Sequence, residues 1–177
     1  MTTEPRSKFL GFVDAQADAV NKRPSVKGEL ARADGTMHSF AVWGGATKDG
    51  QGIYLRGTVT PKDAAAAIAA KVGDVADVEQ PAGLDLKVGE IVLFENDKGD
   101  NDKRPDFYGY SRTAEGINRH SVWSAVAANG SLMLRGTTEL FVPKAAANDA
   151  VAAADSAPTA PAAEAKTKVR QALRQAR

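Results

Sequence analysis

The amino-acid sequence predicts a mainly β protein made of two tandem, similar, four-stranded antiparallel units. Three observations predict this fold. Landmark residues recur in one order at offsets of 79 to 81 residues, side chains alternate between apolar and polar, and glycine-containing turns separate the segments. The first series is Arg23, Pro24, Gly28, Gly35, Trp43, Gly50 and Leu55–Thr58, and the second is Arg104, Pro105, Gly109, Gly116, Trp123, Gly130 and Leu134–Thr137. This recurrence predicts an internal duplication that forms a pseudo-dimer.

Each unit spans about 55 residues, which is marginal for independent stability, so we expect the two units either to pack face to face or to share a core with another chain. Each unit forms a small sheet or a small barrel, for which an OB-like barrel is one candidate. The expected divisions are residues 1–72 for the first unit and its helix, 73–87 for a linker, 88–154 for the second unit and its helix, and 155–177 for a low-complexity linker and a basic C-terminal segment.

The first unit contains four segments with the composition or alternation of β-strands, namely residues 8–13, 26–33, 36–43 and 51–59. Asp34-Gly35 and Asp49-Gly50 supply turns between them, because glycine accepts positive φ without steric cost. Pro61 suits a first helical position and Asp63 suits the positive end of a helix dipole, so a short Ala-rich helix is predicted over 61–72.

The second unit repeats this plan, with strands predicted at residues 90–95, 107–113, 117–126 and 131–142. A polar loop at 96–103 is expected to be a flexible, solvated hairpin loop. An Ala-rich helix is predicted at 144–154, equivalent to the helix after the first unit. The last stretch, 164–177, predicts a short helix in which Val169 and Leu173 lie four residues apart. Two apolar residues make a narrow docking stripe, so we expect a flexible tail.

Composition excludes several classes of protein. The net charge is +1, which is not the strongly basic balance of an avid nucleic-acid binder. There is no cysteine, hence no disulfide and no thiolate metal site. The N-terminus lacks a signal-peptide pattern and no apolar run has the roughly 20 residues of a membrane span, so we expect a soluble, cytoplasmic protein that does not enter a membrane.

The titratable residues do not suggest chemistry. His38 and His120 have no cysteine or carboxylate at ligand spacing, and we interpret both as packed or rim residues. The Asp-rich loop at 96–106 lacks the ordered spacing and terminal glutamate of a calcium loop. No catalytic constellation and no phosphate-cradling loop is present, and the glycines are interpreted as turn glycines. We therefore expect neither a metal, nor a cofactor, nor an enzyme.

The second unit carries a recognisable order of motifs: Phe94-Glu95-Asn96, a polar loop, Arg104 to Gly109 (Arg-Pro-Asp-Phe-Tyr-Gly), Val122-Trp123 and a final Leu-x-Gly strand. This order resembles small, poorly characterised β-proteins of phages and proteobacterial mobile elements, over residues 89–140 and more loosely over 8–60. The resemblance implies a fold and no activity, and for a phage protein it implies the host-cell cytoplasm. The first unit departs from it, with Asp14 in place of Asn96 and Ser25 in place of Asp106.

Duplicated arginines and strand aromatics are the candidate ligand-binding residues, since aromatic rings stack on bases and arginines contact phosphates. Trp43 and Trp123 are more simply interpreted as core anchors, and the arginines equally as solvated charges or partners of Asp34 or Glu115. The candidate residues are Arg23, Trp43, Arg56, Arg104, Tyr108, Tyr110, Arg112, Trp123, Arg135, Lys168, Arg170 and Arg174.

We therefore expect a non-enzymatic protein that binds single-stranded DNA or RNA without sequence preference. The alternative is a structural or protein-interaction component, such as a virion or assembly protein or a phage-encoded inhibitor. In that case sheet edges and the C-terminal segment would contact a protein partner or another copy in a homo-oligomer.

Overall fold

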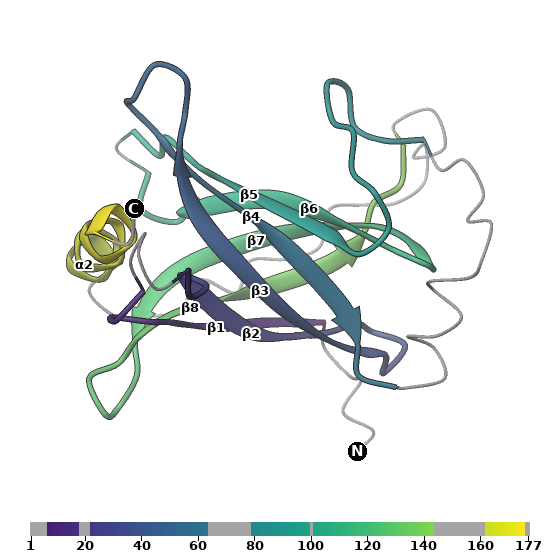
Figure 1. Cartoon of the computed structure of the whole chain (residues 1–177), viewed down its shortest axis with the longest axis horizontal. Coiled ribbons are helices and arrows are strands. Elements are labelled where there is room, and N and C mark those ends of the chain that lie inside the picture. Colours follow the sequence, from purple (N-terminus) through teal and green to yellow (C-terminus); the bar gives the residue numbers. More distant parts are fainter. Residues whose placement is uncertain (1–6, 18–21, 64–78, 100, 144–161, 176–177) are drawn as a thin grey trace.

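The computed structural model describes residues 7–17, 22–63, 79–99, 101–143 and 162–175. Eight antiparallel strands follow one another in chain order and close into a barrel, because β1 also pairs with β8 (Figure 1). The elements are β1 (Lys8–Val13), β2 (Val26–Ala31), β3 (Met37–Ala46), β4 (Ile53–Pro61), β5 (Glu90–Glu95), β6 (Phe107–Thr113), β7 (Gly116–Val126), β8 (Leu132–Leu140) and α2 (Ala162–Gln175).

All eight predicted strands are confirmed, with ends within three residues of those expected. The prediction that the two units pack face to face was wrong. β4 pairs with β5 and β1 pairs with β8, so the two halves join edge to edge in one barrel around one core. Closure satisfies every strand edge, whereas two separate four-stranded sheets would each leave two edges open. Pro61 ends β4 and does not begin a helix; residues 64–72 and the helix predicted at 144–154 lie outside the described residues.

The repeated landmarks occupy corresponding places in the two halves. The Trp43 indole N–H donates to the Lys22 carbonyl oxygen at 3.0 Å, and the Trp123 indole N–H donates to the Lys103 carbonyl oxygen at 3.3 Å. Both tryptophans therefore hold the loop that leads into the second strand of their half. This correspondence is what a duplication requires, and the common ancestry of the halves stays a prediction.

Ser25 and Asp106 occupy corresponding positions in the two halves and have the same role, although they differ in residue type. Ser25 Oγ accepts the backbone N–H of Gly44 at 3.0 Å, and Asp106 Oδ2 accepts the backbone N–H of Ser124 at 2.7 Å. Asp106 is wholly buried and its other carboxylate oxygen lies 2.7 Å from Lys98 Nζ, in a pair that is screened from solvent. The loop expected to be fully solvated is thus anchored by Lys98 inside the protein.

The interpretation of the glycines as turn residues was wrong for four repeated glycines. Gly28, Gly57, Gly109 and Gly136 lie inside strands, at β2, β4, β6 and β8. A Cβ atom at each would lie 1.9 to 2.0 Å from a carbonyl oxygen of the neighbouring strand. Only glycine permits this close approach, which lets the strands coil tightly enough to close a small barrel.

The barrel interior is apolar over one part and polar over another. Alternation sends Phe9, Leu30, Leu55, Leu93 and Phe107 inward, and each is at most 1% exposed. Burying each such side chain stabilises the fold by about 1.5–3 kcal/mol. The polar part comprises Ser111, Thr113, Asn118, His120, Thr138 and His38, all of which are buried.

The C-terminal helix α2 is part of the fold, so the prediction of a flexible tail was wrong (Figure 1). Val169 and Leu173 are 0% and 1% exposed and belong to the hydrophobic core cluster. Lys166 Nζ donates to the Asn96 carbonyl oxygen at 3.3 Å, and the carbonyl oxygen of Leu173 approaches Gly44 of β3. The helix therefore closes the barrel end at which β3 and β5 finish.

Candidate functional site

Six aromatic side chains lie on the outer face of the barrel, towards the end that α2 closes. They come from six of the eight strands and form what we call the outer aromatic row: Phe12, Trp43, Tyr54, Phe94, Tyr108 and Trp123. Each sits in the half of its strand nearest α2, and each alternates with an inward neighbour such as Leu55, Leu93 or Phe107. The row therefore follows from period-two alternation on a closed barrel.

The centre of the row is in register across three neighbouring strands. Tyr54 of β4 lies opposite Phe94 of β5, and Phe94 lies opposite Tyr108 of β6. The Phe94 and Tyr108 ring centroids are 5.8 Å apart with an interplanar angle of 38°. Tyr108 is 43% exposed, while Tyr54 and Phe94 are half-buried. Three rings thus follow one another at the spacing of adjacent strands.

The tryptophans extend the row on both sides. Tyr108 lies opposite Ser121, two residues before Trp123, so these two rings are diagonal neighbours on β6 and β7. Tyr54 lies opposite Gly45, two residues after Trp43, and makes the same diagonal on β3 and β4. Trp43 is 40% exposed. The interpretation of the tryptophans as core anchors was wrong, because neither belongs to the core cluster and both face outward.

Each tryptophan has an arginine directly across from it. Trp43 pairs in register with Arg56, and Trp123 pairs with Arg135. Arg56 Nη2 lies 3.2 Å from Glu90 Oε2, and this arginine is 56% exposed. Arg135 is exposed, and within the described part of the chain no ion pair neutralises it. Both halves thus present the same cross-strand Trp–Arg pair. Arg56 of the first half is paired with Glu90, whereas Arg135 of the second half has no such ion pair among the described residues.

The partner of Arg56 is held ionised. A hydrogen bond from the Lys87 backbone N–H, followed by the Arg56 guanidinium, lowers the pKa of Glu90 below its usual value. The expected partners Asp34 and Glu115 are not used by Arg56 or Arg135. Both instead flank Arg32 at the other end of the barrel, at 3.4 Å and 3.5 Å.

Arg23 and Arg104 lie beside the row. Each directly follows the residue whose carbonyl oxygen accepts a tryptophan indole N–H, and each side chain is exposed. Arg23 Nη1 donates to Gln16 Oε1 at 3.1 Å. These two arginines therefore add positive charge next to Trp43 and Trp123, as the duplicated pattern predicts.

Other predicted residues are placed elsewhere. Tyr110 packs edge-on against Phe141, with ring centroids 5.7 Å apart, and Arg112 Nη1 donates to the Leu86 carbonyl oxygen at 3.0 Å. Lys168 pairs with Glu164 within α2 at 2.6 Å. Arg170 lies 3.2 Å from Glu95 Oε1 and also donates to the Gln51 carbonyl oxygen. These contacts hold loops and α2 in place, while Arg174 is exposed on α2.

Three members of the row were missed from the sequence: Phe12, Tyr54 and Phe94. Phe12 lies three positions after Phe9 in one short apolar strand, and this odd separation puts the two rings on opposite faces. Phe94 ends the apolar run Ile91–Phe94, in which alternation is lost. The register that brings Phe94 between Tyr54 and Tyr108 exists only once β4 pairs with β5.

Among the described residues, no three His, Cys, Asp or Glu side chains gather at one point where they could hold a metal ion. His38 and His120 are buried inside the barrel, which confirms their prediction as packed residues. Over the same described ranges, no helix has the length and apolar character to cross a lipid bilayer.

Comparison with known proteins adds no relative to this description: no protein-family model, curated protein or solved structure matches the chain.

Proposed function

We propose that this protein binds single-stranded nucleic acid without sequence preference, on the outer aromatic row. The observation that carries the proposal is the in-register series Tyr54, Phe94 and Tyr108 on three adjacent strands. Every base has a π-face, so stacking on such rings tolerates any sequence and contributes about 1–3 kcal/mol per base. No catalytic step is needed for this function.

The spacing of the rings suits a single strand. Neighbouring strands lie about 4.8 Å apart, and the Phe94 and Tyr108 centroids are 5.8 Å apart. Stacked nucleotides rise about 3.4 Å each, so a moderately extended single strand can place successive bases on successive rings. A duplex cannot do so, because its bases are paired and stacked on one another. The geometry therefore favours single strands over duplexes.

The cations around the row set the strength and salt dependence of binding. Arg135 and Arg56 lie opposite the two tryptophans, and Arg23 and Arg104 lie next to them. About three phosphate contacts on a single strand give a slope near −2 in the logarithm of the binding constant against the logarithm of salt concentration.

Fluorescence anisotropy with a labelled oligo-dT at low salt tests the proposal. We expect saturable binding by the wild type, at least tenfold weaker binding by Phe94→Ala/Tyr108→Ala, and wild-type binding by Met37→Ala. Met37 is 36% exposed and also outward, but it begins β3 at the far end of the barrel, so it is a matched control. No binding by the wild type at tens of micromolar protein would end the proposal.

A protein-interaction role is the second candidate, and exposed apolar side chains favour it. Leu10 and Phe12 on β1 are 37% and 47% exposed. The sheet edges first considered for this role are not free, because every strand of the closed barrel is paired on both sides. A partner would instead cover the β1 face. Size-exclusion chromatography with light scattering tests self-association through this face. A discrete oligomer that persists after nuclease treatment and that Phe12→Ser converts to monomer supports this role. A monomeric wild type, before and after nuclease treatment, contradicts self-association.

A further inference from the structure

The outer wall of the barrel continues beyond the outer aromatic row, over strands β8, β1 and β2. We call this part the basic face, and alternation makes its outward side chains Met133, Arg135, Thr137, Lys8, Leu10, Phe12, Lys27, Glu29 and Ala31. The face adjoins the row, because Trp123 lies opposite Arg135, which in turn lies opposite Leu10. In the closed barrel β1 is four strands from β5, so the centre of the row is on the other side. A nucleic-acid strand that follows the row from β4 to β7 therefore reaches the basic face next.

The positive charges of this face are not balanced. Lys8, Lys27 and Arg135 are exposed, and none of them forms an ion pair with a described residue. The acidic side chain of the face, Glu29, is already paired with Lys62 at its border. Three cations thus remain available to an anionic ligand.

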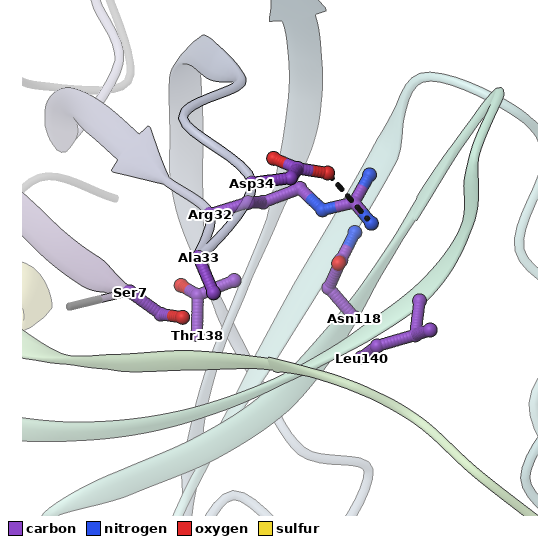
Figure 2. Close-up of a pocket in the computed structure, with 7 residues that line it drawn as sticks. All are labelled: Ser7, Arg32, Ala33, Asp34, Asn118, Thr138 and Leu140. Atoms are coloured by element: carbon purple, nitrogen blue, oxygen red, sulfur yellow. Dashed lines mark ion pairs between the residues drawn. The ribbon is translucent and has the colours of Figure 1, made fainter. Parts of the chain in front are cut away.

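Arg32, which directly follows β2, does not add to this charge. Its Nη2 lies 3.4 Å from Asp34 Oδ2, an ion pair that Figure 2 shows beside a cavity of about 160 Å³ at the barrel end opposite α2. Its Nη1 lies 3.5 Å from Glu115 Oε2. The charge of Arg32 is therefore compensated within the protein, and the basic face depends on the other three cations.

A reversal of charge distinguishes the basic face from the corresponding part of the row. Glu90 on β5 and Lys8 on β1 hold corresponding places, each two residues before the residue that lies opposite an arginine of the neighbouring strand. Glu90 Oε2 lies 3.2 Å from Arg56 Nη2 and balances its charge. Lys8 instead adds a second positive charge on the side of Arg135. The two sides of the barrel thus differ in charge: the row is rich in aromatic rings around a neutralised arginine, and the basic face is rich in free cations.

We propose that the basic face binds the same single strand after it leaves the row at Trp123, so this inference rests on the proposed function. The three cations complement backbone phosphates, and the Phe12 ring, 47% exposed, offers one more base a stacking surface. Arg135 holds the phosphate next to Trp123, and Lys8 and Lys27 hold the phosphates beyond it. A strand that covers both surfaces therefore binds more tightly than one that covers the row alone.

Fluorescence anisotropy with labelled oligo-dT of about five and about fifteen nucleotides tests this extension. The short probe supplies about one base for each ring from Trp43 to Trp123, and the long probe reaches the basic face as well. We expect the wild type to bind the long probe at least tenfold more tightly, after correction for its larger number of binding registers. Two added phosphate contacts, at Lys8 and Lys27, should also make its salt slope steeper by about 1.4.

The variant Lys8→Gln/Lys27→Gln should bind the long probe at least fivefold more weakly, lose the added salt slope and bind the short probe as the wild type does. The control is Lys48→Gln/Lys87→Gln, which removes two other exposed lysines, from the turn after β3 and from the loop before β5. It should keep the preference for the long probe, because neither lysine belongs to the basic face.

The outcomes separate this inference from the proposed function. If the wild type binds both probes and Lys8→Gln/Lys27→Gln keeps the full preference for the long one, the inference is overturned and the row stands. If the wild type binds neither probe, both are overturned. Vesicles of phosphatidylserine and phosphatidylcholine form a separate arm: binding that this variant loses, with unchanged oligonucleotide binding, would overturn the inference by assigning the face to an anionic membrane surface. A wild-type dimer that Phe12→Ser converts to monomer would overturn it in favour of a second copy of the chain.

Discussion

At the scale of single residues, His120 shows how a polar group is accommodated inside this barrel. Its Nε2 lies 2.9 Å from Ser111 Oγ and its Nδ1 lies 3.1 Å from Thr138 Oγ1, so the neutral ring uses both nitrogens. The ring is completely buried, and this desolvation lowers the pKa of His120 to about 3. Burial likewise lowers the pKa of His38. Both rings are therefore neutral in the folded protein near pH 7.

This predicts a loss of stability in mild acid. The folded pKa of His120 is below its unfolded value of 6.5, so the unfolded chain takes up the proton first as pH falls. Its stabilising effect is complete above pH 6.5 and is lost progressively towards pH 3. Between pH 7 and pH 5 the free energy of unfolding should fall by about 2 kcal/mol from this residue.

Urea unfolding at both pH values measures the effect. The variant His120→Gln, which cannot titrate, should be less stable at pH 7 but should lose about 2 kcal/mol less than the wild type on going to pH 5. An identical pH dependence in the two proteins would contradict the burial of a neutral His120.

The strand glycines give a second prediction at this scale. A Cβ at Gly109 would lie 2.0 Å from the Val92 carbonyl oxygen, which is backbone and cannot move aside cheaply. Gly109→Ala should therefore lower the free energy of unfolding by about 3 kcal/mol or more. Gly130→Ala is the control, since its Cβ would meet nothing within 4 Å and only the positive φ is strained. Thermal unfolding of both variants tests this, and equal losses would speak against a close strand approach at Gly109.

At the scale of elements, the eight strands were predictable and the docking of α2 was not. Alternation and glycine turns are local, so they mark strands whatever the tertiary structure. The surface that receives Val169 and Leu173 is the end of a closed barrel, assembled from strands far apart in sequence. From the sequence alone, two apolar residues made too narrow a stripe to predict docking. The open end of a barrel is concave, so two side chains are enough to bury this face of the helix.

The docking of α2 predicts a destabilising substitution at its centre. Leu173 is 1% exposed, and Leu173→Ala should lower the free energy of unfolding by about 2–4 kcal/mol through lost burial and a residual cavity. Gln171→Ala, at an exposed position of the same helix, should change it by less than about 0.5 kcal/mol. Chemical denaturation monitored by tryptophan fluorescence checks both; a Leu173→Ala protein as stable as the wild type would mean that α2 does not close the barrel.

At the scale of the whole molecule, the individual residues of the site could be predicted from the sequence, but their arrangement could not, because it depends on closure of the barrel. Trp43, Trp123, Arg56 and Arg135 were identified because they repeat, and Tyr108 because alternation points it outward. Their joining into one row depends on the β4–β5 pairing, which no local pattern encodes. Two of the basic residues of α2 make ion pairs that the sequence did not predict, Lys168 with Glu164 and Arg170 with Glu95.

The interface itself can be located by photo-cross-linking a bromouracil-substituted single-stranded oligonucleotide to the protein, followed by peptide mass spectrometry. If the outer aromatic row binds the strand, cross-links will fall on peptides that contain Phe94, Tyr108 and Trp123, and unlabelled oligo-dT will compete them away. Cross-links confined to α2 between Lys166 and Arg174, or none above the level of a duplex control, would contradict the account.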